Sequence, residues 1–470
     1  MPAPLTYKAF DRTIVEGPLA KAVWKIAWPT MLQNVISGLQ GIVDHTMVGH
    51  FVGFTGNAAI GVSWQIFIVV IVFISSMYSG MAVLVARFAG ADEPEKVNRT
   101  VYQAFLTSLV LAGFIMAPLG YYFSPQLLDI VNAAPEVKAE ALPYLRTMFT
   151  FGIGLLMFFM LGGALRAAGD AKTPLRLGIM MTLLNMTFNV ILIRGLGPIP
   201  AFGTTGAAMG TVLASVIAAC TGMGLLFTGR CVIRFHRGMS LRPDFVIIRQ
   251  LFTFGLPTGF QGIAMNLAGV FMLRFIGALA NSAEAQAAYT VGYTQLFSLI
   301  TWTSIGLMGA TASVAGQNLG AGKPERTSRS VQVSSRIGMT VAATVGLLFL
   351  TIPDMLLGIF GMDDPVVLQL GRQLLGYLAV SGLFLTVALT YTGGLQGTGD
   401  TKSPMYISLV SNMLLPVGLC FYWQATRGLQ PADIWFAIVL GHFMRSTLSF
   451  LRFRQEKWRD IAVDIEPARA

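Results

Sequence analysis

The chain has 470 residues, of which 54% are hydrophobic and only 11% are charged. Soluble domains carry roughly 25% charged residues, because a charged surface keeps them in solution, so this composition excludes a soluble globular protein. The net charge of +10 would suit a nucleic-acid-binding protein, but the positions of the basic residues argue against that function.

Apolar stretches recur along nearly the whole chain. Each has about 20 residues, which is long enough to cross a hydrocarbon core of about 30 Å. No gap between them could hold a separate aqueous domain. We therefore predict an all-α integral membrane protein with about twelve transmembrane helices. The predicted spans cover roughly residues 22–49, 57–86, 101–123, 141–164, 175–196, 205–228, 251–277, 286–315, 335–357, 374–395, 405–424 and 433–451.

The Lys and Arg residues fix the predicted orientation. If the N-terminus is cytoplasmic, the even-numbered connections and both termini lie on that side with all but six of the 32 basic residues, as the positive-inside rule requires. Topology thus explains the basic charge, and we expect no nucleic-acid partner. We predict a multi-pass protein of the bacterial inner membrane with both termini cytoplasmic and an uncleaved first span. The six exceptions are Lys138, Arg146, Arg194, Arg274, Arg372 and Arg427.

An internal repeat organises the chain. Residues 165–174 read LRAAGDAKTP and residues 395–404 read LQGTGDTKSP, an offset of 230. At the same offset, residues 90–99 (GADEPEKVNR) match residues 320–329 (GAGKPERTSR), and a weaker WPT/LPT match upstream has an offset of 228. Two loops that agree on one offset indicate a duplicated architecture.

Each half of the repeat contains six predicted spans. Because six is even, both halves start on the same side of the membrane and form a parallel repeat. We predict two pseudo-symmetric six-helix bundles that rock against each other around a central cavity. The glycines and prolines of the duplicated loops are either parts of a gate or ordinary turn residues. The predicted segments are a cytoplasmic N-terminal segment (1–21), an N-terminal bundle (22–228), a cytoplasmic connector (229–250), a C-terminal bundle (251–451) and a cytoplasmic tail (452–470).

Asp44 is the one residue among the 22 acidic residues that falls well inside a predicted span. An ionisable side chain there costs roughly 2.5–3.5 kcal/mol on insertion scales and is usually functional. We predict that Asp44 binds a proton or Na⁺. The alternatives are a structural aspartate hydrogen-bonded to neighbouring helices, and an ion pair with Arg274 near the outer end of the seventh span. Arg274 could instead close the outer gate or snorkel to the interface.

Polar side chains of the fifth and sixth spans are expected at a depth similar to that of Asp44. Asn185 and Asn189 lie four residues apart on one helical face, and Thr211 follows in the sixth span. Together with the carboxylate they offer hard oxygen ligands for Na⁺, or a relay around a protonated acid. Alternatively, they only join helices by hydrogen bonds. Ion coupling is expected in the N-terminal half, because the repeat counterparts of the four residues are apolar: Met272, Leu415, Leu419 and Gly441.

Aromatic, methionine and polar side chains inside the spans are candidates to line a substrate cavity, since Met adapts to varied ligands. The candidates are Trp64, Gln65, Met157, Phe158, Gln261, Asn266 and Tyr293.

The opening EGPLAKAVWKIAWPT, which leads into GIVDHTMVGHFVG, resembles the start of multidrug and toxic compound extrusion (MATE) transporters. The stretch ASVAGQNLGAGKPERTSRSV at 312–331 is similar to the loop after their eighth helix, and GTGDTKSP at 397–404 to the loop after their tenth. The resemblance covers essentially the whole chain and points to the bacterial DinF-like branch. It implies twelve helices in two bundles and antiport of small cationic or amphiphilic compounds, such as drugs, toxins or metabolites, against H⁺ or Na⁺.

The resemblance also carries over to single positions. It implies that Asp44 matches the family's first-helix acid and that Thr211 matches a sixth-helix threonine. Asn185 and Asn189 match a fifth-helix pair in which some members place Asp second. With Asn189 in place of that Asp, the resemblance implies one titratable group here. Acids in the seventh and tenth helices of another branch are missing here, with Met-Asn at 265–266 and Leu-Thr at 385–386, which argues for coupling through the N-terminal bundle.

Other functions remain as alternatives. A flippase for a lipid-linked or polysaccharide substrate of the same superfamily should carry several basic residues in its cavity, and we count only Arg274 inside a span. An enzyme is not expected, because the sequence has no DDxxD, HxxxxD or HExxH pattern. A static channel fits a duplicated chain less well than alternating access.

Three cysteines and four histidines show no metal-ligand spacing, so we expect no cofactor and no metal other than Na⁺. We expect a monomer; the exported compound and the coupling ion stay open.

Overall fold

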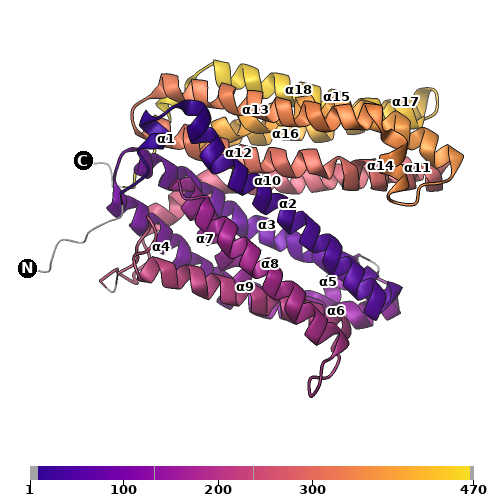
Figure 1. Ribbon diagram of the computed structural model, residues 1–470, viewed down its shortest axis with the longest axis horizontal. Coiled ribbons are helices and arrows are strands. Elements are labelled where there is room, and N and C mark those ends of the chain that lie inside the picture. The colour runs from indigo at the N-terminus through magenta and orange to yellow at the C-terminus, as the bar shows by residue number, and fades with distance from the viewer. Residues whose placement is uncertain (1–8, 132, 237, 466–470) are drawn as a thin grey trace, which may run out of the picture. The chain divides into compact units, whose positions relative to one another are not determined.

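The computed structural model describes residues 9–131, 133–236 and 238–465. Within these ranges the backbone is helical apart from connecting loops and one isolated bridge between Leu196 and Ile199 (Figure 1). The helices of the first half are α1 (Thr13–Glu16), α2 (Leu19–Phe51), α3 (Phe54–Gly90), α4 (Pro94–Val110), η1 (Leu111–Met116), α5 (Ala117–Ile130), α6 (Pro135–Phe151), α7 (Ile153–Ala167), α8 (Lys172–Arg194) and α9 (Gly203–Phe227).

The second half repeats this order with its own breaks. Its helices are α10 (Phe245–Gly277), α11 (Ser282–Tyr289), η2 (Thr290–Leu296), α12 (Ser298–Gly320), α13 (Pro324–Thr351), α14 (Pro353–Gly358), α15 (Pro365–Thr398), α16 (Lys402–Ser408), η3 (Leu409–Leu414), α17 (Leu415–Thr426), α18 (Pro431–Arg454) and η4 (Lys457–Asp460). The segments η1, η2 and η3 are π-helical and continue the α-helices beside them, whereas η4 is a 3-10 turn.

The long helices confirm a multi-pass membrane protein with two six-helix halves. Of the described helices and uninterrupted helical runs, ten are long and apolar enough to cross a membrane. The pair α6 and α7, bent by 52° at Gly152, can form an eleventh span. The remaining predicted span is α2, which has 33 residues and whose apolar character is diluted by polar residues such as Gln33, Gln40 and Asp44.

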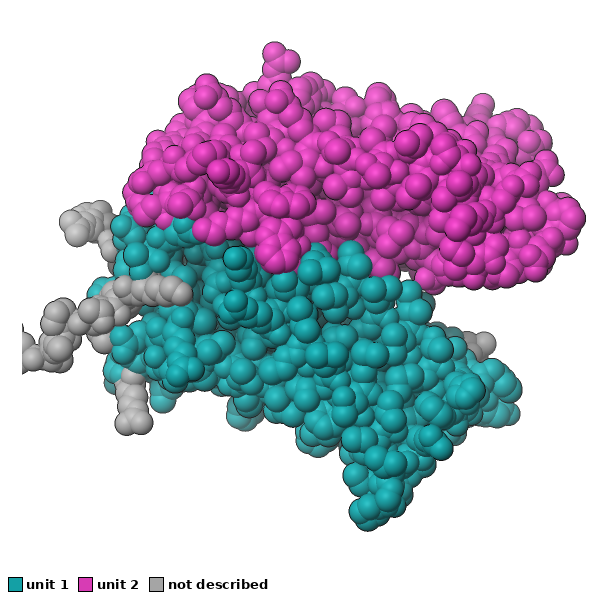
Figure 2. Space-filling model, viewed as in Figure 1, with its two compact units in different colours: residues 1–11, 32–259, 463–470 teal, residues 12–31, 260–462 magenta. Residues whose placement is uncertain are grey.

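The chain forms two compact units (Figure 2). Unit 1 contains residues 32–259 with short terminal segments, and unit 2 contains residues 12–31 and 260–462. The unit boundaries therefore fall inside α2 and inside α10, at positions that the offset of 228 residues makes equivalent. By this division the connector 229–250 belongs to unit 1.

Close helix crossings explain why the unit boundaries fall inside α2 and α10. In unit 1 a Cβ atom on Gly255 of α10 would overlap the backbone carbonyl of Ser76 in α3. In unit 2 a Cβ atom on Gly306 of α12 would lie 2.7 Å from the Cα of Met31 in α2. Small residues let helix backbones approach this closely in membranes, so each repeat begins with a helix whose first part packs in one unit and whose second part packs in the other.

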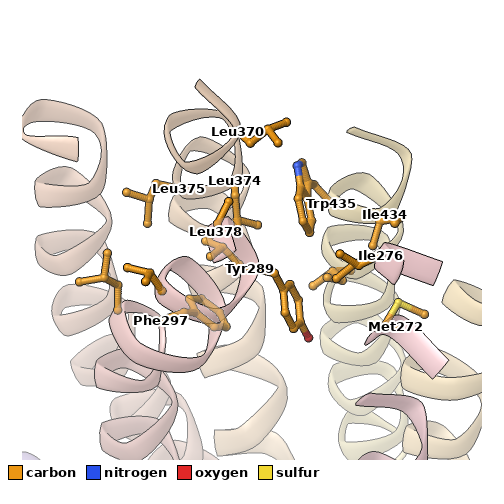
Figure 3. Close-up of a cluster of buried hydrophobic side chains, with 14 of the residues drawn as sticks. Met272, Ile276, Tyr289, Phe297, Leu370, Leu374, Leu375, Leu378, Ile434 and Trp435 are labelled. Atoms are coloured by element: carbon orange, nitrogen blue, oxygen red, sulfur yellow. The ribbon is translucent and has the colours of Figure 1, made fainter. Parts of the chain in front are cut away.

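Unit 2 is built around α15, which packs against α12, α13 and α18. Leucines of α15, including Leu370, Leu374 and Leu378, gather with Phe297 and Trp435 in a buried cluster (Figure 3). In unit 1 the long helix α3 packs against α4, α6 and α7, and α8 packs along α9 (Figure 1).

The duplicated GD loops are capped turns in this structure. Gly169 and Gly399 have φ values of 95° and 101°, a conformation that favours glycine. The carboxylates that follow accept hydrogen bonds from the next helix: Asp170 from the Thr173 backbone N–H (3.0 Å) and Asp400 from the Ser403 backbone N–H (3.2 Å). Local backbone geometry thus explains why this motif occurs twice.

Candidate functional site

The four polar residues singled out in the N-terminal half meet in unit 1. Asn189 Nδ2 of α8 donates to Asp44 Oδ1 of α2 at 2.8 Å and to Asn185 Oδ1 at 3.3 Å. Asn185 Nδ2 donates to Thr211 Oγ1 of α9 at 3.1 Å, and Thr211 Oγ1 donates to the Ala207 carbonyl at 3.1 Å. The side chains of three helices therefore form one hydrogen-bonded chain that ends on the carboxylate.

This chain of hydrogen bonds occupies one oxygen of the Asp44 carboxylate. Asn185 and Asn189 are fully buried, and Asn189 Oδ1 has no hydrogen-bond partner. For Asp44, the hydrogen bond to Oδ1 is the one recorded in the described part of the chain. The other carboxylate oxygen of Asp44 is thus free to accept a proton or to ligate a hard cation, whereas Asn189 Oδ1 lies against Gly210.

Gly210 makes room for this arrangement. It lies next to Thr211 on α9, and a Cβ atom at Gly210 would overlap Asn189 Oδ1. A residue with a side chain at this position would displace the amide that holds Asp44. The close packing of α8 on α9 therefore positions the amide.

A cavity of about 200 Å³ opens beside the carboxylate, within unit 1. Its wall combines polar groups near Asp44 with aromatic rings, which suits a ligand that is both charged and apolar. The lining includes Gln40, Asp44, Trp64, Tyr144, Phe158, Thr182 and Thr211.

Several of these lining residues were not singled out from the sequence. Thr182 Oγ1 donates to Gln40 Oε1 at 2.7 Å, which joins α8 to α2 a second time. Gln40 lies four residues before Asp44, so helical spacing would have placed it on the same face. His45 contacts Asn57 of α3, a partner that the sequence could not supply.

Of the seven predicted cavity residues, four line one of the two cavities and three do not. In unit 1, Trp64 and Phe158 line the cavity, whereas Gln65 is exposed and Met157 is buried away from the lining. In unit 2, Asn266 and Tyr293 line a second cavity of about 200 Å³. Gln261 is buried in unit 2, where it donates to Ser408 Oγ at 2.9 Å and accepts from Gln396 Nε2 at 3.1 Å. Arg274 is exposed near the end of α10.

The count of cations inside the spans was wrong. Arg445 lies in the middle of α18 and is 1% exposed, so Arg274 is not the only arginine in a span. Arg166, near the end of α7, donates from Nη1 to Gln33 Oε1 at 3.1 Å. Arg445 falls inside the predicted span 433–451, so the sequence already placed it in the membrane, and only its burial required the structure.

Among the described residues, no group of three or more His, Cys, Asp or Glu side chains could hold a metal ion. The ligands available to a cation beside Asp44 are therefore one carboxylate with amide and hydroxyl oxygens. These are hard ligands, which suit Na⁺ or a proton better than a transition metal.

Comparisons with known proteins agree with this architecture. The MatE family model matches residues 29–191 and again residues 257–422, so each half of the repeat matches separately. The probable multidrug resistance protein NorM of Thermotoga maritima is 27% identical over 452 residues, 95% of this chain and 94% of that protein. The multidrug resistance protein MdtK of Pectobacterium atrosepticum is 25% identical over 446 residues, 93% of this chain and 95% of that protein.

Solved structures give the same fold. A MOP superfamily transporter from Pyrococcus furiosus has a TM-score of 0.88 at 21% identity, covering 97% of this chain and 100% of that one. An outward-facing multidrug resistance MATE family transporter has the same TM-score, identity and coverage. The two matched halves and the helical membrane fold agree with the resemblance drawn from the sequence. The chain belongs to the MatE family.

Proposed function

We propose that this protein is a secondary active antiporter that exports small cationic or amphiphilic compounds in exchange for H⁺ or Na⁺. The observation that carries the proposal is the carboxylate of Asp44, held by an amide relay at the wall of a cavity inside a membrane-spanning bundle. A charge in such a place is costly and is usually kept for function.

The geometry supports competition between the ion and the compound. A deprotonated carboxylate beside a cavity with aromatic walls attracts a cation, and the rings of Trp64 and Phe158 offer apolar surface to its body. Binding of H⁺ or Na⁺ to Asp44 removes the charge that holds the compound. Exchange of the two as the bundles alternate their opening couples export to the ion gradient.

Relatives support the drug-efflux part of the proposal. Two proteins similar over more than nine tenths of this chain bear names of multidrug resistance proteins. We place the protein in the bacterial plasma membrane as a monomer. We also place both termini in the cytoplasm, an orientation that the distribution of its basic residues supports. A flippase for lipid-linked sugars is not favoured, and membership of a transporter family gives no reason to propose catalysis.

Efflux from everted vesicles or proteoliposomes tests the proposal. A fluorescent lipophilic cation is loaded, and either a pH or a Na⁺ gradient is imposed. We expect efflux with one of the two gradients, and its loss in Asp44→Asn. Thr46→Val is the matched control, because Thr46 is exposed two residues away on α2 and bonds to its own helix backbone. Gradient-driven efflux by Asp44→Asn at the wild-type rate would refute the proposal.

A further inference from the structure

The second cavity, in unit 2, takes no part in the proposed coupling. Its volume is about 200 Å³, and α10, α11, η2, η3, α17 and α18 contribute to its wall. The residues that matter here are Met265, Tyr289, Tyr293, Asn412 and His442. Its surface differs from that of the first cavity, because no carboxylate lines it.

Asn412 presents unmet hydrogen-bonding capacity to this cavity. Both its Nδ2 and its Oδ1 are buried without a partner in the described part of the protein. It lies in the π-helical segment η3, and Tyr293 lies in the π-helical segment η2. Such segments inside α-helices occur frequently at functional sites. A buried amide without partners is rare in folded proteins, so Asn412 is available to bind a molecule in the cavity.

Arg445 places a positive charge directly behind the cavity wall. It is 1% exposed, and its Nη1 lies 3.9 Å from Sδ of Met265, which lines the cavity. Its Nε has no hydrogen-bond partner, and among residues 9–131, 133–236 and 238–465 no ion pair with it is recorded. A thioether is a weak acceptor, and a guanidinium does not lose its proton in proteins. The charge is therefore uncompensated, which is costly for a buried group.

Stacked aromatic rings make the adjoining wall rigid. Tyr289 stacks on Tyr293 with ring centres 4.9 Å apart, and Trp435 stacks on Tyr289 at 6.0 Å. In Figure 3 the Tyr289 hydroxyl is at the end of the ring away from Trp435. Within the described residues neither tyrosine hydroxyl makes a hydrogen bond, whereas the His442 ring is held by Ser381 Oγ at 2.6 Å. The two hydroxyls remain available as donors.

We propose that the cavity of unit 2 binds a small anion, namely the carboxylate of a single-ring aromatic acid. Arg445 balances its charge, Asn412 and the tyrosine hydroxyls donate to its oxygens, and its ring packs beside Met265 and Met272. The volume limits the ligand, because it lies below the roughly 300–1,000 Å³ of pockets for drug-sized molecules. The site is independent of the ion coupling proposed for Asp44.

Calorimetric titration of the purified full-length protein in detergent tests this site with benzoate, neutral benzamide and chloride as probes. We expect saturable binding of benzoate at millimolar concentrations or below, and no binding of benzamide or chloride. Arg445→Met should weaken benzoate binding at least tenfold. Arg454→Met, at an exposed position of the same helix, should bind benzoate like the wild type.

A second variant and a second readout protect the test against misfolding. Benzoate should raise the thermal unfolding midpoint of the wild type, because a ligand that binds the folded state stabilises it, and Asn412→Leu should remove that shift. Asp44→Asn should still bind benzoate, which separates this site from the proposed antiport. Any one of three results would overturn the proposal. These are no binding of benzoate, equal binding of benzamide or chloride, and unchanged benzoate binding in both Arg445→Met and Asn412→Leu.

Discussion

The two cavities lie at equivalent places in the two halves and differ in their polar groups. At the offset of 228 residues, four positions of α2 that line the first cavity correspond to four positions of α10 that line the second. The polar residues of the first set are replaced by apolar ones in the second. The pairs are Ser37 and Met265, Gln40 and Ala268, Gly41 and Gly269, and Asp44 and Met272.

This comparison separates what the duplication preserved from what diverged. The capped GD loops are present in both halves, because backbone geometry demands them. Each unit also has a glycine at a close helix crossing, but the two are not repeat counterparts, since Gly306 corresponds to Ser76 and Gly255 to Ala27. The charges at the two cavities differ: the acid Asp44 lines the cavity of unit 1, and the base Arg445 lies behind the wall of the cavity of unit 2. The scaffold is therefore shared, whereas function depends on the side chains placed in it.

The largest effect should come from making the relay of unit 1 resemble unit 2. Asn189→Leu introduces the residue of the equivalent position, Leu419, and removes the donor to Asp44. A hydrogen bond to a charged group contributes about 1.5–3 kcal/mol, so we expect the initial rate of efflux to fall at least about tenfold. Thr187→Val on the exposed side of α8 serves as the control. An unchanged rate in Asn189→Leu would show that the amide does not tune the acid.

The helix crossing in unit 2 should be the next most sensitive feature. Gly306→Ala forces α12 away from the backbone of Met31, and overpacking of this kind costs about 1–3 kcal/mol. We expect a lower thermal unfolding midpoint in detergent. Gly309→Ala is the matched control, since its new methyl group would meet Thr30 Cγ2 at 4.0 Å, an ordinary contact. Equal midpoints for the two variants would contradict the close crossing.

Gly210→Ala should affect transport more than stability. The new methyl group displaces Asn189 Oδ1, a side-chain atom that can shift, so we expect a cost of about 1 kcal/mol together with slower gradient-driven efflux. Gly224→Ala on the same helix has open space around it and should change neither property. Efflux from Gly210→Ala vesicles that equals that of Gly224→Ala would argue against a positioning role.

The smallest effect should distinguish the two GD loops. Both aspartates cap the following helix, and loss of such a cap costs about 1 kcal/mol. Asp400 also accepts from Arg452 Nε at 2.8 Å and is 6% exposed, whereas Asp170 has no ion pair recorded in the described ranges. Asp400→Ala should therefore lower the unfolding midpoint more than Asp170→Ala. The reverse order would indicate that the Arg452 contact does not stabilise the folded state.

The sequence by itself determined the membrane class, the helical architecture and the repeat, because bilayer thickness and hydropathy constrain each helix locally. It also singled out Asp44 as a candidate for ion coupling, since a single acid in an apolar span is visible without any contact. The tertiary structure decided which side chains from distant parts of the sequence contact one another. The donors that hold Asp44, the separate positions of Gln65 and Trp64, and the burial of Arg445 depend on which faces of distant helices pack together. Close approaches such as that of Gly210 to Asn189 contribute to that pairing, and no linear pattern reports them.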